Sequence, residues 1–399
     1  MRILQINAVY GVGSTGVIVQ DLHELSLKNG IESYVAFSKS KMQLSEIKNG
    51  YKVGSVFGKK LHALFGRING KQAYFSRFAT RKLLKHIRRI KPDIVHLHNL
   101  HSNYIHLNML LKFLAAENIK TVITLHDCWF YTGGCFYYTV VQCNRWMSGC
   151  YDCPKKLQDT RAYFFDRCAQ IWSNRRRYLG AINSLQIVGV SHWITSEFQK
   201  SNIGANRFFT IYNGIDTDYF CPTISSLRQE LGLENKFVIL GMANKWLLKA
   251  NEETLHAVCD GLEQDSVLLL VGCTSQEKLP SNVIPFEYIH DRDLLRKIYS
   301  MADVFVNCTR EDSLPTVNLE AQACGTPIIT YENTGTMETV DGISGFAVAN
   351  NDSCALLKKI NEVKRNGKLQ YSHACREYVV RTFRKEINYQ AYFALYKSL

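Results

Sequence analysis

The feature that most constrains the fold of this chain is a regular alternation of short apolar segments with longer amphipathic ones. The alternation runs through the first half of the chain and restarts in the second half. Strands that are apolar throughout are buried on both faces, and helices between them cover a parallel sheet. The segments that we predict to be strands are RILQINAV, ESYVAF, DIVHLHN, TVITLHD and LQIVGVS in the first half, and KFVILGMA, SVLLLVGC, ADVFVNCT and TPIITY in the second.

The restart of this pattern predicts an α/β protein with two Rossmann-like domains in series. A length of 399 residues is sufficient for two such domains. We place the first domain at residues 1–205 and the second at residues 206–380, joined by the turn-rich segment YNGIDTDYFCPT. Residues 381–399 are expected to form a helix that packs back on the first domain.

Positive charge is concentrated in one part of the chain. The formal net charge is +13, and residues 47–92 contain no Asp or Glu. Lysines and arginines in this segment alternate with apolar side chains at helical spacing, which is typical of a face that lies on an anionic membrane. A solvated basic helix pair around an ordinary core is an alternative interpretation, and nucleic-acid binding is another that no accompanying motif supports.

The N-terminus and the hydropathy pattern bear on the location of the protein. The opening segment MRILQINAVY reads as a first buried strand rather than a signal peptide. No uncharged apolar stretch approaches the ~18 residues of a spanning helix. Together with the basic segment, these features predict a cytoplasmic protein that is peripheral on the inner face of the plasma membrane.

A glycine-rich loop follows the first predicted strand. Residues 11–16 spell G-x-G-x-x-G and open a helix, which is the context of a dinucleotide site. The second strand, ESYVAFSKS, ends without the acidic residue that would hold a ribose in NAD. What remains is a set of backbone N–H groups at a positive helix end, suited to a phosphate. A merely tight strand-to-helix turn is an equally good interpretation.

Acidic residues gather after the strand ADVFVNCT in the second half. Glu311 and Asp312 lie in the following loop, and Glu320 lies on the next predicted helix. Open α/β sheets bind ligands at the carboxyl ends of their strands. Carboxylates there can accept hydrogen bonds from sugar or ribose hydroxyls. The N–H groups of Thr316 and Val317, at the helix start, can hold a diphosphate.

These motifs resemble a known family, the retaining GT-B glycosyltransferases of family 4. Asp312-x7-Glu320 has the spacing of the family's E-x7-E region, with Asp in place of the first Glu. The segment AQACGTP that follows is similar to its A-x-A-x-G-x-P, and NGIDTDYF is similar to its interdomain N-G-[IV]-D-x-x-x-F. HDCWFYTGGC and GCYDCP resemble the subgroup that assembles colanic acid, capsule and O-antigen. The resemblance implies a GT-B fold, with two Rossmann-like domains facing a central cleft.

The resemblance also implies roles for particular residues near the donor sugar. Glu320 would bind the ribose of the nucleotide. Asp312 would contact the transferred sugar, and the neighbouring Glu311 is an alternative for that contact. His126, which follows the strand TVITLHD, would lie by the reacting carbon and help to position the sugar.

Other implied roles concern the phosphates. Gly13 and Gly16 would face the donor phosphate or the acceptor. The family's basic residues on the diphosphate are assigned here to Lys249 first and Lys245 second, because the usual Arg and Lys-Gly are absent from GMANKWLLKANEE. The family needs no cofactor for catalysis.

The function implied by the resemblance is retaining transfer of a hexosyl or N-acetylhexosaminyl group from a nucleotide-sugar donor, with UDP favoured over GDP. The acceptor would be a lipid-linked saccharide in bacterial surface polysaccharide synthesis. Two alternatives are a GT-B sugar-nucleotide epimerase and a non-catalytic basic protein that binds membrane or nucleic acid. We expect no nucleic-acid partner.

The first half also contains a cysteine-rich insertion at residues 128–153. Its last pair has the C-x2-C spacing of a zinc knuckle, whereas the other spacings are not those of a standard zinc site. Structural zinc, free thiols and disulfides therefore all remain open, with Cys135, Cys143, Cys150 and Cys153 as the candidate ligands. The insertion is also rich in Trp, Tyr and Phe, which would stack on sugar rings, meet a lipid tail or form a small core of their own.

Overall fold

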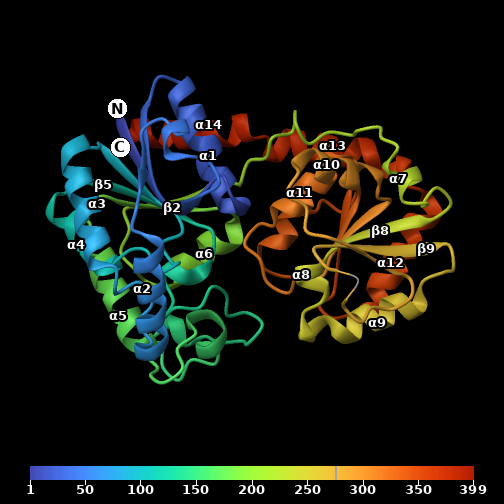
Figure 1. The fold of residues 1–399 in the computed structure, drawn as a ribbon, viewed down its shortest axis with the longest axis horizontal. Coiled ribbons are helices and arrows are strands. Elements are labelled where there is room, and N and C mark those ends of the chain that lie inside the picture. Colours follow the sequence, from blue (N-terminus) through green and yellow to red (C-terminus); the bar gives the residue numbers. More distant parts are fainter. Residues whose placement is uncertain (275) are drawn as a thin grey trace. The chain divides into compact units, whose positions relative to one another are not determined.

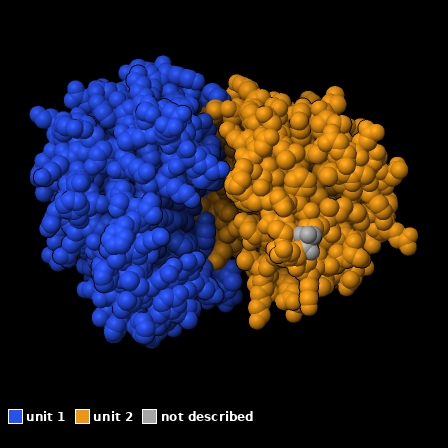
Figure 2. Space-filling view, viewed as in Figure 1, with its two compact units in different colours: residues 1–213, 386–399 blue, residues 214–385 orange. Residues whose placement is uncertain are grey.

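The computed structural model describes residues 1–274 and 276–399, which form two compact units. Unit 1 comprises residues 1–213 and 386–399, and unit 2 comprises residues 214–385 (Figure 2). The chain passes between the units at Asn213-Gly214, inside the predicted linker but eight residues beyond the predicted boundary at 205. The chain returns to unit 1 at residue 386, whereas the predicted C-terminal helix on this unit begins at residue 381.

Unit 1 is built on a parallel seven-stranded sheet with the order β3-β2-β1-β4-β5-β6-β7. Every pairing in this sheet is parallel, so the carboxyl ends of its strands meet along one edge. The strands are β1 (Arg2–Tyr10), β2 (Glu32–Ser40), β3 (Gly50–Lys52), β4 (Ile94–Leu97), β5 (Lys120–Leu125), β6 (Leu185–Gly189) and β7 (Arg207–Thr210).

Helices lie between these strands, as the alternating pattern predicts (Figure 1). The chain's last helix, α14 (Lys385–Ser398), packs its tyrosines against the sheet and α1, in a core that includes Ile3, Ile18 and Tyr392. The other helices of unit 1 are α1 (Gly13–Lys28), α2 (Val56–Asn69), α3 (Arg77–Ile90), α4 (Leu107–Ala116), α5 (Cys168–Leu179) and α6 (His192–Lys200).

Unit 2 repeats the plan with a parallel six-stranded sheet in the order β10-β9-β8-β11-β12-β13. Its strands are β8 (Phe237–Met242), β9 (Ser266–Val271), β10 (Val283–Phe286), β11 (Val304–Asn307), β12 (Ile328–Tyr331) and β13 (Gly345–Val348). Its helices are α7 (Leu227–Glu230), α8 (Ala243–Trp246), α9 (Glu252–Gly261), α10 (Arg292–Met301), α11 (Thr316–Ala323), α12 (Ser353–Asn366) and α13 (Leu369–Phe383).

Hydrophobic burial stabilises each sheet. The centre of unit 2 contains Ile239, Leu268 and Val306, all fully buried, together with residues of α9 and α12. Burying a side chain of this kind contributes roughly 1.5–3 kcal/mol relative to leaving it exposed. In the described residues, no helix has the length and apolar character that crossing a bilayer requires.

Candidate active site

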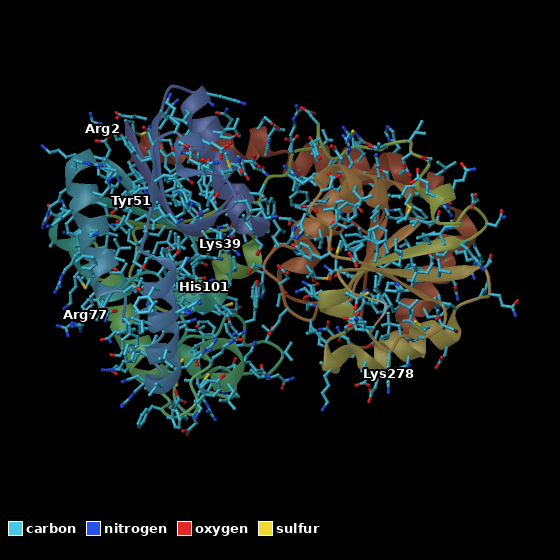
Figure 3. The ribbon with its side chains drawn as sticks, viewed as in Figure 1. Arg2, Lys39, Tyr51, Arg77, His101 and Lys278 are labelled. Carbon is cyan, nitrogen blue, oxygen red and sulfur yellow. The ribbon has the colours of Figure 1, made fainter. Side chains whose placement is uncertain are left out.

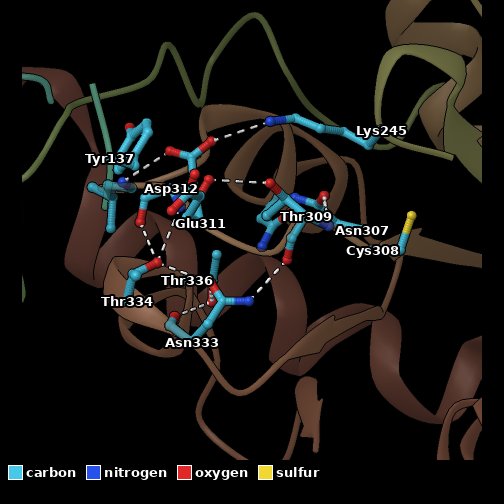
Figure 4. A network of polar contacts seen from close by, with 12 residues as sticks. Tyr137, Lys245, Asn307, Cys308, Thr309, Glu311, Asp312, Asn333, Thr334 and Thr336 are labelled. Carbon is cyan, nitrogen blue, oxygen red and sulfur yellow. Dashed lines mark hydrogen bonds and ion pairs between the residues drawn. The ribbon is translucent and has the colours of Figure 1, made fainter. Parts of the chain in front are cut away.

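The acidic loop of unit 2 lies between β11 and α11, at the carboxyl end of the sheet. The turn that follows the neighbouring strand β12 holds the loop in place. The N–H of Asp312 donates to Thr334 Oγ1 at 3.0 Å, and the Thr334 hydroxyl donates to the Asp312 carbonyl at 2.7 Å (Figure 4). The Gly335 N–H donates to the same carbonyl at 3.0 Å. The main chain of Asp312 is therefore held by the turn after β12, and its carboxylate adds a contact with the Leu314 N–H at 3.2 Å.

A buried ladder of side-chain amides and hydroxyls lies beneath this loop. Asn307 Nδ2 donates to Asn318 Oδ1 at 2.8 Å, and Asn318 Nδ2 donates to Thr339 Oγ1 at 2.9 Å. All three side chains are at most 3% exposed. Buried polar groups with satisfied partners rigidify what they connect, so the end of β11 is tied to the start of α11.

Lys245 forms an ion pair with Asp312. Its Nζ lies 3.9 Å from Asp312 Oδ2, because β8 and β11 are adjacent and α8 starts where β8 ends. Burial raises the pKa of Asp312, whereas the Lys245 charge lowers it. Lys249, the first choice from the sequence, is exposed on the short turn Lys249–Asn251. The structure thus brings the second choice, and not the first, to the carboxylate.

Glu320 lies one turn into α11. The hydroxyl of Tyr299, which is fully buried, donates to Glu320 Oε2 at 3.0 Å. Burial raises the pKa of Glu320 to about 7, although the Tyr299 hydrogen bond and the nearby charge of Arg292 both lower it. This carboxyl group therefore changes protonation near neutral pH, which is common at sites that bind ligands.

The start of α11 is suited to an anion. Pro315 occupies the N-cap position, no side chain caps the helix, and the first turn has no acidic residue. The helix begins at Thr316 and Val317, the two residues whose amides the sequence assigned to a diphosphate. A helix N-terminus carries about half a positive charge, which favours a phosphate at this end.

In unit 1, the glycine loop joins β1 to α1. Gly13 is exposed with φ +65°, and a Cβ built there would meet no neighbour within 4 Å. Gly16 is buried, and a Cβ there would lie 3.1 Å from Val9 Cγ2. Gly16 therefore permits the close approach of α1 to β1, and its predicted contact with the donor phosphate or the acceptor stays a prediction.

His126 follows β5 and belongs to a row of buried histidines. Its Nε2 lies 3.1 Å from His98 Nδ1. The His96 ring, 4.0 Å from the His98 ring, contacts the Tyr396 hydroxyl through Nδ1 at 2.7 Å. Burial lowers the pKa of His126 to about 4 and that of His96 to about 3. At neutral pH these imidazoles are uncharged, so His126 can act on a sugar by hydrogen bonding rather than by charge.

The histidine row predicts that unit 1 loses stability in mild acid. Between pH 6.5 and 4 the unfolded chain protonates these histidines, whereas the folded chain does not. The free energy of unfolding should therefore fall as the pH falls, by up to about 1.4 kcal/mol per pH unit for each histidine. Urea unfolding at pH 7.5 and pH 5 measures this slope. His98→Asn should reduce it, and His373→Asn, at an exposed position, should not. Equal stability at both pH values would contradict the prediction.

Two residues that the sequence analysis did not single out lie next to His126. Asp127 Oδ2 is 3.1 Å from His101 Nε2, and Asp127 also caps the short turn that follows β5. His101 lines a cavity of about 210 Å³ together with Gln72, Asn103 and Arg161. The lining is rich in hydrogen-bonding groups suited to sugar hydroxyls. The histidines of DIVHLHNLH were the available signal for this region.

The cysteine-rich insertion brings its four candidate zinc ligands to one place. Cys135, Cys143, Cys150 and Cys153 line one small cavity of about 20 Å³, and all cysteines are free thiols. In the described residues, no three His, Cys, Asp or Glu side chains are arranged to hold a metal ion. Burial raises the pKa of the Cys150 thiol to about 12, whereas the hydrogen bond with Cys168 lowers the pKa of Cys153 to about 7.

The aromatic residues of the insertion form a small core. Trp129, Tyr131 and Trp146 are at most 1% exposed, and Arg175 lies over the Trp129 ring at 3.7 Å. Phe130 and Tyr138 are also buried. These buried rings form a core of the insertion's own, whereas Phe136 and Tyr137 are only partly buried and Phe136 lines the cavity that contains His101.

Two models of known protein families match this chain. The family model described as Glycosyltransferase Family 4 matches residues 15–219, and the one described as Glycosyl transferases group 1 matches residues 219–380. The chain therefore belongs to Glycosyltransferase Family 4. It is a glycosyltransferase, as the resemblance of its motifs predicted.

Individual relatives agree with this assignment. A putative colanic acid biosynthesis glycosyl transferase of Escherichia coli is 25% identical over 382 residues, 90% of each chain. Anabaena HepE in complex with UDP superimposes with a TM-score of 0.70 at 16% identity, covering 100% of both chains. WaaG, a glycosyltransferase involved in lipopolysaccharide biosynthesis, gives a TM-score of 0.64 at 16% identity over 98% of each chain. The predicted GT-B fold class is confirmed.

Proposed function

We propose that this glycosyltransferase transfers a hexosyl or N-acetylhexosaminyl group from a UDP-sugar to a lipid-linked saccharide, with retention of configuration, in bacterial surface polysaccharide synthesis. The observation that carries the donor assignment is the arrangement of Asp312, Lys245 and Glu320 around the start of α11. The UDP complex of HepE and the printed roles of the colanic acid enzyme and WaaG support the nucleotide and the pathway class. The comparisons do not favour an epimerase.

In this proposal the residues of unit 2 hold the donor. Glu320 accepts hydrogen bonds from the ribose, and Asp312 accepts them from the transferred sugar. Lys245 and the amides of Thr316 and Val317 stabilise the negative charge that develops on the leaving diphosphate. The bond between the sugar carbon and the phosphate oxygen breaks while a bond to the acceptor oxygen forms on the same face. The departing phosphate takes the acceptor's proton, so no protein nucleophile is needed.

The raised pKa of Glu320 predicts how nucleotide binding depends on pH. Ribose hydroxyls donate to the ionised carboxylate, so binding favours the deprotonated form and affinity should rise through about pH 7. From pH 6 to pH 8 the ionised fraction grows about tenfold, and the Kd for UDP should fall by a similar factor. Calorimetry at both pH values tests this. The nucleotide's own phosphate also titrates, and the Glu320→Gln variant measures how much of the change in Kd with pH is due to it. An equal change in Kd in the variant and in the unmodified protein would contradict the prediction.

The proposed location is cytoplasmic and peripheral on the inner face of the plasma membrane, with unit 1 in contact with lipid. The exposed side chains of α2 include Phe57, Leu64 and Ile68, and the surrounding segment 47–92 has no carboxylate. Sedimentation should show binding to vesicles that contain anionic lipid, and binding should weaken as salt rises because the attraction is screened. Salt-independent binding to neutral vesicles would contradict this mechanism.

The central experiment is a thermal shift with nucleotides followed by a donor screen. UDP at millimolar concentration should raise the Tm, because a ligand that binds only the folded state stabilises it. GDP should raise it less. Transfer or hydrolysis would then be measured with UDP-Glc, UDP-Gal, their N-acetyl forms, GDP-Man and GDP-Fuc. If neither nucleotide changes the Tm, the donor assignment is wrong.

A further inference from the structure

A large cavity lies between α2 and α3 in unit 1, outside the residues assigned to the donor or to His126. Its volume is about 630 Å³, within the ~300–1,000 Å³ of small-molecule sites. Leu61, Phe65, Phe75 and Phe78 supply its apolar wall, and the Phe65 and Phe75 ring centroids lie 5.8 Å apart. We call it the α2–α3 pocket.

The same pocket carries positive charge. Lys52, Lys59, Arg77 and Lys82 line it, and Arg77 is labelled in Figure 3. Lys59 Nζ donates to the Ser38 carbonyl at 3.3 Å rather than to a carboxylate. Burial and the neighbouring charge of Lys52 lower the pKa of Lys59. Cations gathered without carboxylates are stabilised when an anion binds among them.

A buried histidine is also among the residues around the pocket. His62 is 1% exposed, and its Nδ1 lies 2.6 Å from the Ser76 hydroxyl. Its Nε2 is buried and has no hydrogen-bond partner in the described residues. Burial lowers the pKa of His62 to about 4, so the ring is neutral. Ser76, which precedes α3 and also lines the pocket, donates its hydroxyl hydrogen to the Asn103 carbonyl at 3.4 Å, so the neutral His62 ring helps to hold this part of the wall in place.

The topology places part of the pocket at the carboxyl ends of the strands, which is the edge of the sheet where His126 also lies. Lys52 ends β3, and Tyr104, another lining residue, follows β4. His126 follows β5, and the carboxyl ends of these parallel strands meet at one edge. The cavity that contains His101 is lined by Ala63, Gly66 and other residues of α2. One helix thus contributes to an apolar, basic cavity and to a polar one.

We propose that the α2–α3 pocket binds a single-chain lipid phosphate, with the first part of the chain against the phenylalanines and the phosphate among the lysines. This inference rests on the proposed function, because such a group is the lipid end of the proposed acceptor. The sugar part would extend toward the polar cavity lined by His101. An apolar wall combined with several basic side chains matches a ligand with an anionic head and a hydrocarbon tail. Neither a free nucleotide nor a neutral lipid has both.

Binding of farnesyl phosphate to the full chain tests the pocket, with farnesol and inorganic phosphate as single-part controls. Phe65→Ser should raise the Kd at least tenfold, whereas Phe57→Ser, exposed on the same helix but outside the pocket, should change it less than twofold. The double variant Lys59→Gln/Lys82→Gln should weaken binding to a similar extent. Its matched control is Lys60→Gln/Lys85→Gln, on the same two helices but outside the pocket.

The outcomes separate the pocket from general adhesion and from the proposed function. Equal losses in test and control variants, or tight binding of farnesol alone, would overturn the pocket. Sugar transfer to a lipid acceptor by a chain that does not bind farnesyl phosphate would overturn the pocket and leave the proposed function standing. Binding with the expected variant pattern, but without transfer to any lipid acceptor, would support the pocket and refute the proposed acceptor. The thermal shift with UDP reports the donor site separately.

Discussion

Replacing Glu320 with alanine is expected to weaken UDP binding by about 10- to 100-fold. Hydrogen bonds to a charged group contribute about 1.5–3 kcal/mol, and each 1.4 kcal/mol corresponds to a factor of ten in Kd. Glu320 is the carboxylate that Tyr299 orients at 3.0 Å on α11, and alanine removes every acceptor that the ribose would use. Calorimetric titration with UDP at pH 8, where the carboxylate is ionised, measures the loss directly.

A matched control and a stability measurement make this result specific. Glu332→Ala removes an exposed carboxylate from the same unit and should leave the Kd unchanged. Burial raises the pKa of Glu320 in the folded protein above its value in the unfolded chain. The free energy of unfolding is therefore greatest below the pKa of the unfolded chain, and part of it is lost as the pH rises through about 7. Glu320→Gln should therefore raise the Tm of the free protein at pH 8 while weakening UDP binding. A lower Tm with unchanged affinity would assign Glu320 a structural role.

Replacing Asp312 with asparagine is expected to lower kcat about 100-fold with little change in KM. Loss of one preorganised hydrogen-bonding group that stabilises a transition state typically costs about 10²–10³ in kcat. The Leu314 N–H donates to Asp312 Oδ1 at 3.2 Å, and an asparagine Oδ1 can accept the same bond, so the loop should keep its shape. Steady-state transfer measured with the donor found in the screen gives both constants.

The neighbouring Glu311 supplies the comparison for this variant. Like Asp312→Asn, Glu311→Gln replaces a carboxylate with an uncharged amide, but at the adjacent residue. The kcat of this variant should fall less than threefold. Lys245→Gln should also lower kcat, because its Nζ lies 3.9 Å from Asp312 Oδ2 beside the proposed diphosphate position. If Glu311→Gln causes the large loss and Asp312→Asn does not, then Glu311 contacts the sugar and the assignment is reversed.

The strands show how far local pattern predicts this fold. The sequence pattern does not predict four of the strands, namely β3 and β7 in unit 1 and β10 and β13 in unit 2. Each of them lies at an edge of its sheet. Edge strands are short and have one unpaired side, so they need no continuous apolar run, and β10 even contains Pro285. The central strands, buried on both faces, were all recognisable.

The lysine assignment shows a second limit of the sequence. Lys245 and Lys249 are four residues apart in one segment, and a motif that lacks its usual spacing does not distinguish them. The distinction depends on α8, a helix of only four residues that ends at Trp246, whose buried indole Nε1 donates to the Val306 carbonyl at 3.1 Å. Anchoring Trp246 to β11 leaves Lys245 beside the acidic loop and Lys249 exposed.

By itself, the sequence determined the α/β class, the division into two sheets and the acidic motif, because each depends on residues within a few turns of one another. Asp312 and Glu320 are joined by one loop and one helix, and their spacing is a local property. The partners of these residues are not local. Thr334 and Lys245 reach the motif because the order β8-β11-β12 brings separate loops to one edge, and Tyr299 reaches it from α10, which packs against α11.

The tertiary structure alone decided the features of unit 1 that surround His126. His96 contacts Tyr396, a residue 300 positions away, and no periodicity in the sequence connects them. The α2–α3 pocket likewise depends on how two basic helices pack against residues that follow β3 and β4. Local patterns encode which face of a helix or strand is buried. The order of the strands in each sheet, and the packing of the C-terminal helix on unit 1, decide which buried faces meet.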